Sequence, residues 1–266
     1  MNRIAGIVVA AIGLIIAVLG VLKVLPGLTQ TGVMLIVLGG LIIGLSFISG
    51  PDPGDTPRES TPSTLVNIFF SPTEVFQQLR RHPRWLAAAL IMSLMTAVFS
   101  NLFLYRLTPE RVTNFTIDKT LEMSFLNDDA RKQIESGRKD AIDQAKNPVI
   151  RAGQAVSSFG GLVIWFAFLG LFFFVFVLAM GGKLNYWQAF SAAVYASFPV
   201  AVIRFILNTI ILFVKDPVDI HPITGQSSLV QDNLSFLVTA SEHPVIYTVL
   251  ASLSLLWFYW IFLNIT

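Results

Sequence analysis

The sequence predicts an all-α, polytopic helical membrane protein with about six transmembrane helices. Of its 266 residues, 54% are hydrophobic and only 13% are charged, whereas soluble domains carry about 25% charged residues. The mean hydropathy is +0.70. Several apolar runs are also long enough to cross the roughly 30 Å of hydrocarbon in a bilayer.

Charge and cysteine content exclude several classes of function. The net charge is +2, and the basic residues are scattered over loops rather than gathered in a stripe, so nucleic acid is not an expected partner. The chain contains no cysteine. This excludes disulfides, thiolate metal sites, covalently attached c-type haem and a cysteine nucleophile.

We expect residues 1–49 to form an N-terminal transmembrane hairpin. Two apolar runs separated by a short turn make up this segment, residues 4–25 and 31–48. A cleaved signal peptide is the alternative, because Arg3 precedes an apolar run, but no small-residue cleavage site is evident and the second run follows at once. Gly40 and Gly44 give a small-xxx-small face that another helix could approach closely; ordinary membrane-helix composition is the other interpretation.

Residues 50–62 are rich in proline and glycine and predict a linker. The main membrane domain, residues 63–266, should open with an amphipathic helix over 72–81, because Ser71 precedes a proline suited to the first helical turn. With one apolar face and a cationic end, this interfacial helix should lie along the membrane. Its predicted membrane-surface residues are Arg80, Arg81, Arg84 and Trp85.

Four further apolar runs predict transmembrane helices, namely 86–105, 160–180, 186–214 and 244–264. Two polar loops separate them, 106–154 and 215–243. The first loop should contain two short extramembrane helices, beginning near Thr108 and Asn127, and Asn147–Pro148 should end the second. The faces expected to pack are Val112, Phe115, Leu121 and Phe125 on the first helix, and Ala130, Ile134, Ala141 and Ile142 on the second.

The distribution of lysine and arginine in short loops predicts a cytoplasmic N terminus. Six basic residues fall on that side: Arg3, Arg58, Arg80, Arg81, Arg84 and Lys183. Lys23 and Lys215 lie in the short loops opposite. The long loop 106–154 carries nine basic residues on the other side together with eight acidic ones, and its length makes it less decisive.

The segment that links the apolar runs 160–180 and 186–214 combines a glycine turn with an aromatic belt. Gly181, Gly182 and Lys183 should form a tight turn at the membrane boundary, and Tyr186 and Trp187 should anchor it there. The ordinary interface belt also explains the other aromatic residues near predicted boundaries, Trp85, Tyr105 and Tyr247.

The candidate functional residues within the membrane are Arg204, Pro199, Tyr195 and Asn101. Pro199 removes a backbone donor near the middle of the span 186–214 and should bend it. An intramembrane arginine is costly enough to count as a functional hypothesis. Arg204 would need a partner such as Asn101, Tyr195 or a carbonyl freed by Pro199, and contact with a ligand or a lipid phosphate is the alternative.

No catalytic pattern is present. Nucleotide-binding glycine motifs, zinc-protease motifs and hydrolase elbows are missing from the sequence, and no acidic residue falls inside a predicted span. His82, His221 and His243 share no helix face and are divided between two sides of the membrane, so we expect no metal site. No cofactor and no enzymatic activity are expected.

Several of these features together resemble the Yip domain (Ypt/Rab-interacting protein) family. The resemblance covers roughly residues 63–266. It rests on Ser71-Pro72-Thr73-Glu74-Val75-Phe76, His82-Pro83-Arg84-Trp85, and Gly181-Gly182 followed by Tyr186, Ala189, Tyr195 and Pro199. The resemblance implies a cytoplasmic amino-terminal segment and a bundle of about five closely spaced transmembrane helices, of which residues 63–266 would supply four. It also implies a bacterial-type member of the family, in the inner membrane. The hairpin departs from the family pattern, which also leads one to expect a further helix after Thr266. No acidic cytoplasmic motif precedes Leu86, so GTPase binding is not carried over.

The expected function is that of a non-enzymatic interaction or organising component, or an accessory subunit of a membrane complex. Its expected partners are membrane lipids and other membrane proteins. The alternative is a transporter or channel-like protein with a path near Pro199 and Arg204.

Overall fold

The computed structural model describes residues 3–52, 57–230, 232–233, 237, 245–246, 249–250 and 253–265. Four of its helices are long and apolar enough to cross a membrane: α1 (Arg3–Val21), α5 (Leu86–Leu107), α9 (Pro148–Ala179) and α10 (Tyr186–Val214). A shorter apolar helix, α2 (Thr29–Leu45), pairs with α1. The prediction of an all-α polytopic membrane protein is therefore confirmed.

The remaining elements are shorter. They are α3 (Thr61–Asn67), α4 (Pro72–Arg81), α6 (Pro109–Leu121), α7 (Asp128–Ser136), α8 (Arg138–Lys146), the 3-10 turn η1 (Pro217–Asp219), α11 (Thr224–Ser227) and α13 (Leu255–Ile265). Helix α4 begins and ends where the sequence predicted the amphipathic helix, and α10 matches the predicted fifth span. Of the predicted span 244–264, the second half corresponds to α13, and much of the first half lies outside the described residues.

Two boundary predictions were wrong. Helix α9 begins at Pro148 rather than at residue 160, because Asn147 caps it by accepting a hydrogen bond from the Val149 amide at 2.9 Å, and no further proline follows before it ends at Ala179. The second extramembrane helix is divided at Gly137 into α7 and α8. Glycine is a weak helix former, and Arg138 just after it pairs with Asp118 of α6 at 2.7 Å.

The chain forms two compact units. The first contains Met1–Phe47, Ser93–Gly161 and Phe205–Leu229, and the second contains Ile48–Met92, Leu162–Arg204 and Val230–Thr266. Helices α5, α9 and α10 contribute residues to both.

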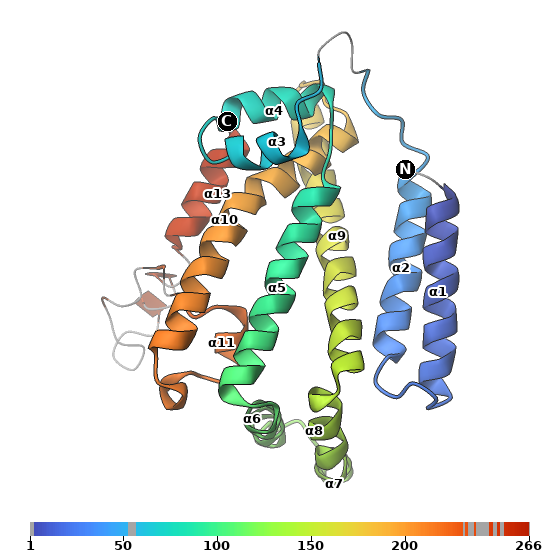
Figure 1. Ribbon diagram of the computed structural model, residues 1–266, viewed down its shortest axis with the longest axis vertical. Helices are drawn as coiled ribbons and strands as arrows, with labels where there is room; N and C mark the ends of the chain where they lie inside the picture. The colour runs from blue at the N-terminus through green and yellow to red at the C-terminus, as the bar shows by residue number, and fades with distance from the viewer. Residues whose placement is uncertain are drawn as a thin grey trace. The chain divides into compact units, whose positions relative to one another are not determined.

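The first unit contains the α1–α2 hairpin and the short helices α6, α7 and α8 (Figure 1). Its core consists of Phe99, Phe103, Leu107, Val112, Leu212 and Ile220. Arg111 of α6 donates to the carbonyls of Pro217, Val218 and Ile220 at 2.6, 3.3 and 3.4 Å, which fixes the segment after α10 to the start of α6. Of the face predicted for α6, Val112 is buried, whereas Phe125 lies beyond the helix and is 79% exposed.

In the second unit, α3 and α4 lie crosswise to the long helix α10 (Figure 1). Ile68, Val75 and Leu79 are fully buried, and the ring of Phe69 contacts that of Phe198 with centroids 6.1 Å apart. The apolar face of α4 is therefore covered by protein. Arg80 and Arg81 remain exposed on its outer side.

Candidate functional site

The turn between α9 and α10 is built from two local motifs. Gly181 has a φ of +80°, which glycine adopts without strain. The Gly181 amide donates to the Leu178 carbonyl at 3.0 Å and the Gly182 amide to the Val177 carbonyl at 2.9 Å, the bond pair of a Schellman ending. The predicted glycine turn is formed, with Lys183 exposed.

Asn185 and Gln188 then start α10 as a reciprocal cap. The Trp187 amide donates to the Asn185 side-chain oxygen at 2.9 Å, and the Asn185 amide donates to Gln188 Oε1 at 2.7 Å. Each side chain thus satisfies a backbone donor that the first helical turn would leave free. The start of α10 is determined by these neighbours along the chain.

Tyr186 and Trp187 are buried in the second unit rather than facing the membrane boundary. They are 6% and 7% exposed. Tyr186 donates its hydroxyl to the Ala167 carbonyl at 3.2 Å, and the Trp187 indole donates to the Ile48 carbonyl at 2.9 Å. Backbone carbonyls of the same unit thus accept the hydrogen bonds of both side chains, and their anchoring at a membrane boundary stays a prediction.

Arg84 also differs from its expected place at the membrane surface. It is only 9% exposed, and its Nη1 lies 3.5 Å from Thr61 Oγ1. Its Nε and Nη2 are buried and have no hydrogen-bond partner in the described part of the chain. Burial lowers the pKa of Arg84, which Tyr195 and Glu59 partly oppose and Arg58 reinforces. Tyr195 therefore lies near Arg84. The neighbouring Trp85 contacts the Phe190 ring edge-on.

Arg204 lines an aromatic cavity of about 360 Å³ in the second unit. Trp165, Trp257 and Trp260 form much of the wall. The Trp260 indole donates to Ser197 Oγ at 2.8 Å, and Ser197 donates to the Ala193 carbonyl at 2.9 Å. The Nε atom of Arg204 is buried without a hydrogen-bond acceptor among the described residues. Pro199 is buried within α10.

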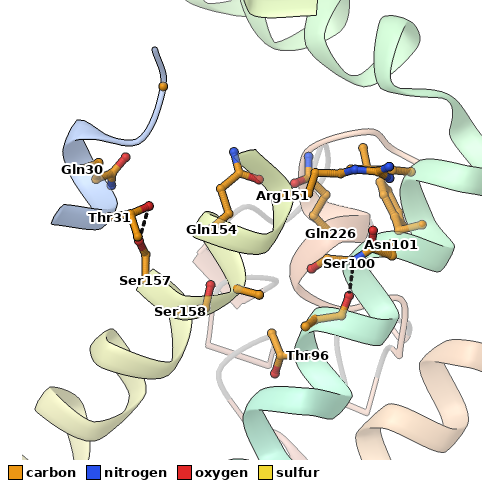
Figure 2. A pocket seen from close by; sticks show the side chains of 15 residues that line it. Gln30, Thr31, Thr96, Ser100, Asn101, Arg151, Gln154, Ser157, Ser158 and Gln226 are labelled. Atoms are coloured by element: carbon orange, nitrogen blue, oxygen red, sulfur yellow. Dashed lines mark hydrogen bonds between the residues drawn. The ribbon is translucent and has the colours of Figure 1, made fainter. Parts of the chain in front are cut away.

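Asn101 belongs to a different site, a polar cavity of about 420 Å³ in the first unit (Figure 2). The Asn101 amide donates to the Ala97 carbonyl at 2.8 Å. Of the four predicted intramembrane residues, Arg204 and Asn101 thus line two different cavities, and neither Pro199 nor Tyr195 is among the described residues that line them.

The polar cavity is lined from four helices, α2, α5, α9 and α11. Its polar side chains are Gln30, Thr31, Thr96, Ser100, Asn101, Arg151, Gln154, Ser157, Ser158 and Gln226 (Figure 2). Thr31 and Ser157 join α2 to α9 by a hydrogen bond of 3.0 Å. On this side of α9, Gly153 and Gly160 allow close contact with Leu28 and Met34 of the hairpin.

Sequence reasoning missed Arg151 and its neighbours. The signal was present as a polar stripe at helical spacing, Arg151, Gln154 and Ser158, which continues into the apolar run. A second polar pair, Ser100 and Asn101, marks α5. The sequence of neither helix shows that the α9 stripe and the α5 pair line the same cavity.

The histidines are distributed over both units. His221 accepts hydrogen bonds from the Ile223 and Thr224 amides at 3.2 Å each, and its ring lies edge-on to Phe115 with centroids 5.0 Å apart. His82 follows α4 in the second unit. His243 and Tyr247 lie outside the described residues.

Comparison with known families identifies residues 66–266 as a Yip1 domain. No curated protein and no solved structure matches the chain. Proteins of this family are multispan membrane proteins that interact with membrane proteins and are generally non-enzymatic. Because the matched segment covers well over half of the sequence, the chain belongs to the Yip1 domain family.

Proposed function

We propose that this protein is a non-enzymatic interaction component of the membrane, which docks a helix of another membrane protein through its N-terminal hairpin. The observation that carries the proposal is an open glycine face on α2. Val33, Val37, Gly40 and Gly44 share this face at helical spacing, and all four are exposed. No heavy atom of the described chain lies within 4 Å of a Cβ built on Gly40 or Gly44.

The other two faces of α2 are occupied. Gly32 and Gly39 meet the backbone of α1, and a Cβ on either would lie 2.3 to 2.7 Å from α1 atoms. Thr31 and Leu38 are buried on the side that contacts α9. The hairpin is thus already fixed without Gly40 and Gly44, so these two glycines are available for a different helix.

Small residues favour such docking inside a membrane. Lipid chains are as apolar as leucine, so helix association there depends on close backbone packing, which glycine permits. The exposed valines beside the two glycines would pack against the partner helix, and their short side chains would not hold it away. A membrane-protein partner on this face is compatible with the role of an organising component or accessory subunit.

Photocrosslinking tests the proposal with a matched pair of sites. A photoreactive residue replaces Val37 on the open face or Ile12 on α1, which are 50% and 48% exposed. We expect position 37 to crosslink one defined membrane protein and position 12 to crosslink lipid. The same partner should co-purify with the unmodified protein in gentle detergent and be identified by mass spectrometry.

Substitutions on the open face of α2 provide a second test of helix docking. Gly40→Leu combined with Gly44→Leu should abolish both the crosslink and co-purification without disturbing the hairpin. Gly161→Leu on α9 is the control, because its Cβ would also meet nothing within 4 Å. A partner retained by the double variant, or equal crosslinks from positions 12 and 37, would refute docking on this face.

The alternative function, a transporter, draws support from the cavity at Arg204. The Nε atom of Arg204 is buried without an acceptor among the described residues. It could contact a solute in the cavity that three tryptophans and Ser197 line. In proteoliposomes, Arg204→Ala should then abolish uptake while the protein remains monodisperse. An organising component would tolerate the same change and would transport no solute.

The membrane and the orientation enter as part of the proposal. We place the protein in a bacterial inner membrane with its N terminus in the cytoplasm, on the lysine and arginine distribution. Exposed Arg80 and Arg81 on α4 would then face anionic lipid headgroups on that side. A reporter that is active only in the cytoplasm should be active when it is fused before Arg3. A reporter that is active only outside the cytoplasm should be inactive at the same position.

A further inference from the structure

The polar cavity of the first unit contains one cation and no opposing charge. Among the described residues that line it, Arg151 is the only ionisable one and none carries a carboxylate. Its Nε is buried and lacks a hydrogen-bond acceptor in the described ranges. Arg151 as a whole is half-buried, and its one buried nitrogen without an acceptor carries a desolvation cost that a bound anion would lower.

The surroundings of Arg151 add neutral hydrogen-bond donors. Side-chain amides lie on three separate helices, Gln154 on α9, Asn101 on α5 and Gln226 on α11, and Figure 2 shows them around the same space. Serine and threonine hydroxyls line the rest of the cavity. Arg151 also lies in the first turn of the long helix α9, where the helix dipole favours negative charge.

We propose that this cavity binds a phosphate group, with Arg151 as its principal ligand. The planar guanidinium can donate two parallel hydrogen bonds to phosphate oxygens. The side-chain amides of Asn101 and Gln226 each already donate one hydrogen, to the carbonyls of Ala97 and Pro222 at 2.8 Å. Their second hydrogens and the Gln154 amide can donate to the remaining phosphate oxygens. A volume of about 420 Å³ is in the range of small-ligand sites. A cation or an apolar molecule would leave Arg151 uncompensated.

Two sources can supply this chemistry. Basic pockets between transmembrane helices bind lipid headgroups, and a soluble phosphate ester offers the same group without acyl chains. The site is separate from the open face of α2, because Thr31 lines the cavity whereas Gly40 does not. Failure of helix docking would therefore leave this proposal intact, and the reverse holds too.

The test measures ligand binding to the delipidated full-length protein in a neutral detergent. The probes are dioctanoyl phosphatidylglycerol, glycerol phosphate, inorganic phosphate and dioctanoylglycerol, which lacks phosphate. Binding is followed by calorimetry and by the melting temperature from far-ultraviolet circular dichroism. We expect phosphatidylglycerol to bind and to raise the melting temperature, and dioctanoylglycerol to do neither.

The two soluble phosphates distinguish the source. Binding of glycerol phosphate or inorganic phosphate assigns the site to the phosphate group itself. Binding of phosphatidylglycerol alone assigns it to a lipid headgroup. Both outcomes support the proposal. Equal binding of phosphatidylglycerol and dioctanoylglycerol, or no binding of any phosphate probe, overturns it.

Variants test the role of Arg151. R151Q should raise the Kd for the phosphate probe about 10- to 100-fold, which is the usual effect of losing a charged hydrogen-bond donor. R151K keeps the charge but not the two-pronged geometry and should lose less. K139Q removes an exposed charge of α8 in the same unit and should bind like the unmodified protein. An unchanged Kd in R151Q, with or without a fall in the ligand-free melting temperature, shows a structural arginine and overturns the proposal.

Discussion

Replacing Gly32 by alanine should separate the two helices of the N-terminal hairpin. A Cβ at this position would lie 2.3 Å from the Ala17 amide nitrogen, 2.6 Å from Ala17 Cα and 2.7 Å from the Gly13 carbonyl oxygen. All three are backbone atoms, so no side chain can rotate away. Bringing the closest pair to the 3.4 Å of an ordinary contact requires a shift of about 1 Å.

The cost of that shift can be estimated from overpacked cores, where one extra methyl group costs about 1–3 kcal/mol. The matched change in the same helix is Gly40→Ala, whose Cβ would meet nothing within 4 Å. Alanine is favoured over glycine in a helix by about 0.5–1 kcal/mol, so this variant should be neutral or slightly stabilised. The two substitutions add the same atom and differ only in what it contacts.

Hydrogen exchange followed by mass spectrometry measures the result, because it reports local opening of the hairpin directly. Gly32→Ala should speed exchange of the protected α1 and α2 amides by about 5- to 150-fold, as expected for a loss of about 1–3 kcal/mol. Gly40→Ala should leave it unchanged or slower. If the two variants exchange alike, the α1–α2 contact is not the one that stabilises the hairpin.

Three further predictions concern other elements. Gly181→Ala should lower the melting temperature through a loss of about 1–2 kcal/mol, because alanine is strained at a φ of +80°; Gly50→Ala, with open space around it, is the control. Trp260→Phe should cost about 1 kcal/mol by removing the bond to Ser197, while Trp257→Phe, at a 49% exposed ring, should change stability little. Arg111→Gln should speed limited proteolysis of residues 216–224, since three carbonyls lose their donor; the exposed Lys132→Gln should not.

The helices themselves were largely predictable, because their signals are local. Pro72 and Arg81 bound α4 as the sequence predicted, and the Gly-Gly turn ends α9 through bonds within a few residues. Errors arose where a local signal had two meanings. Asn147–Pro148 was interpreted only as a helix end, although a capping asparagine followed by proline also begins a helix.

The surroundings of the candidate residues were much less predictable. Tyr186, Trp187 and Arg84 have the composition of a membrane interface, but all three are buried in the second unit. Asn101 was considered as a partner for Arg204, and the two belong to different units. A side chain's neighbours depend on which helices pack together, which spacing along one helix does not reveal.

For this protein, then, the sequence by itself determined the membrane class, the apolar spans and most helix ends. These depend on hydrophobic transfer of contiguous residues and on capping within one turn. Only the tertiary structure brought Arg151 of α9, Asn101 of α5 and Gln226 of α11 to one cavity, and only it left Gly40 and Gly44 open while closing Gly32 and Gly39. Both arrangements depend on helix packing, because close approach is decided by atoms from segments far apart in the chain.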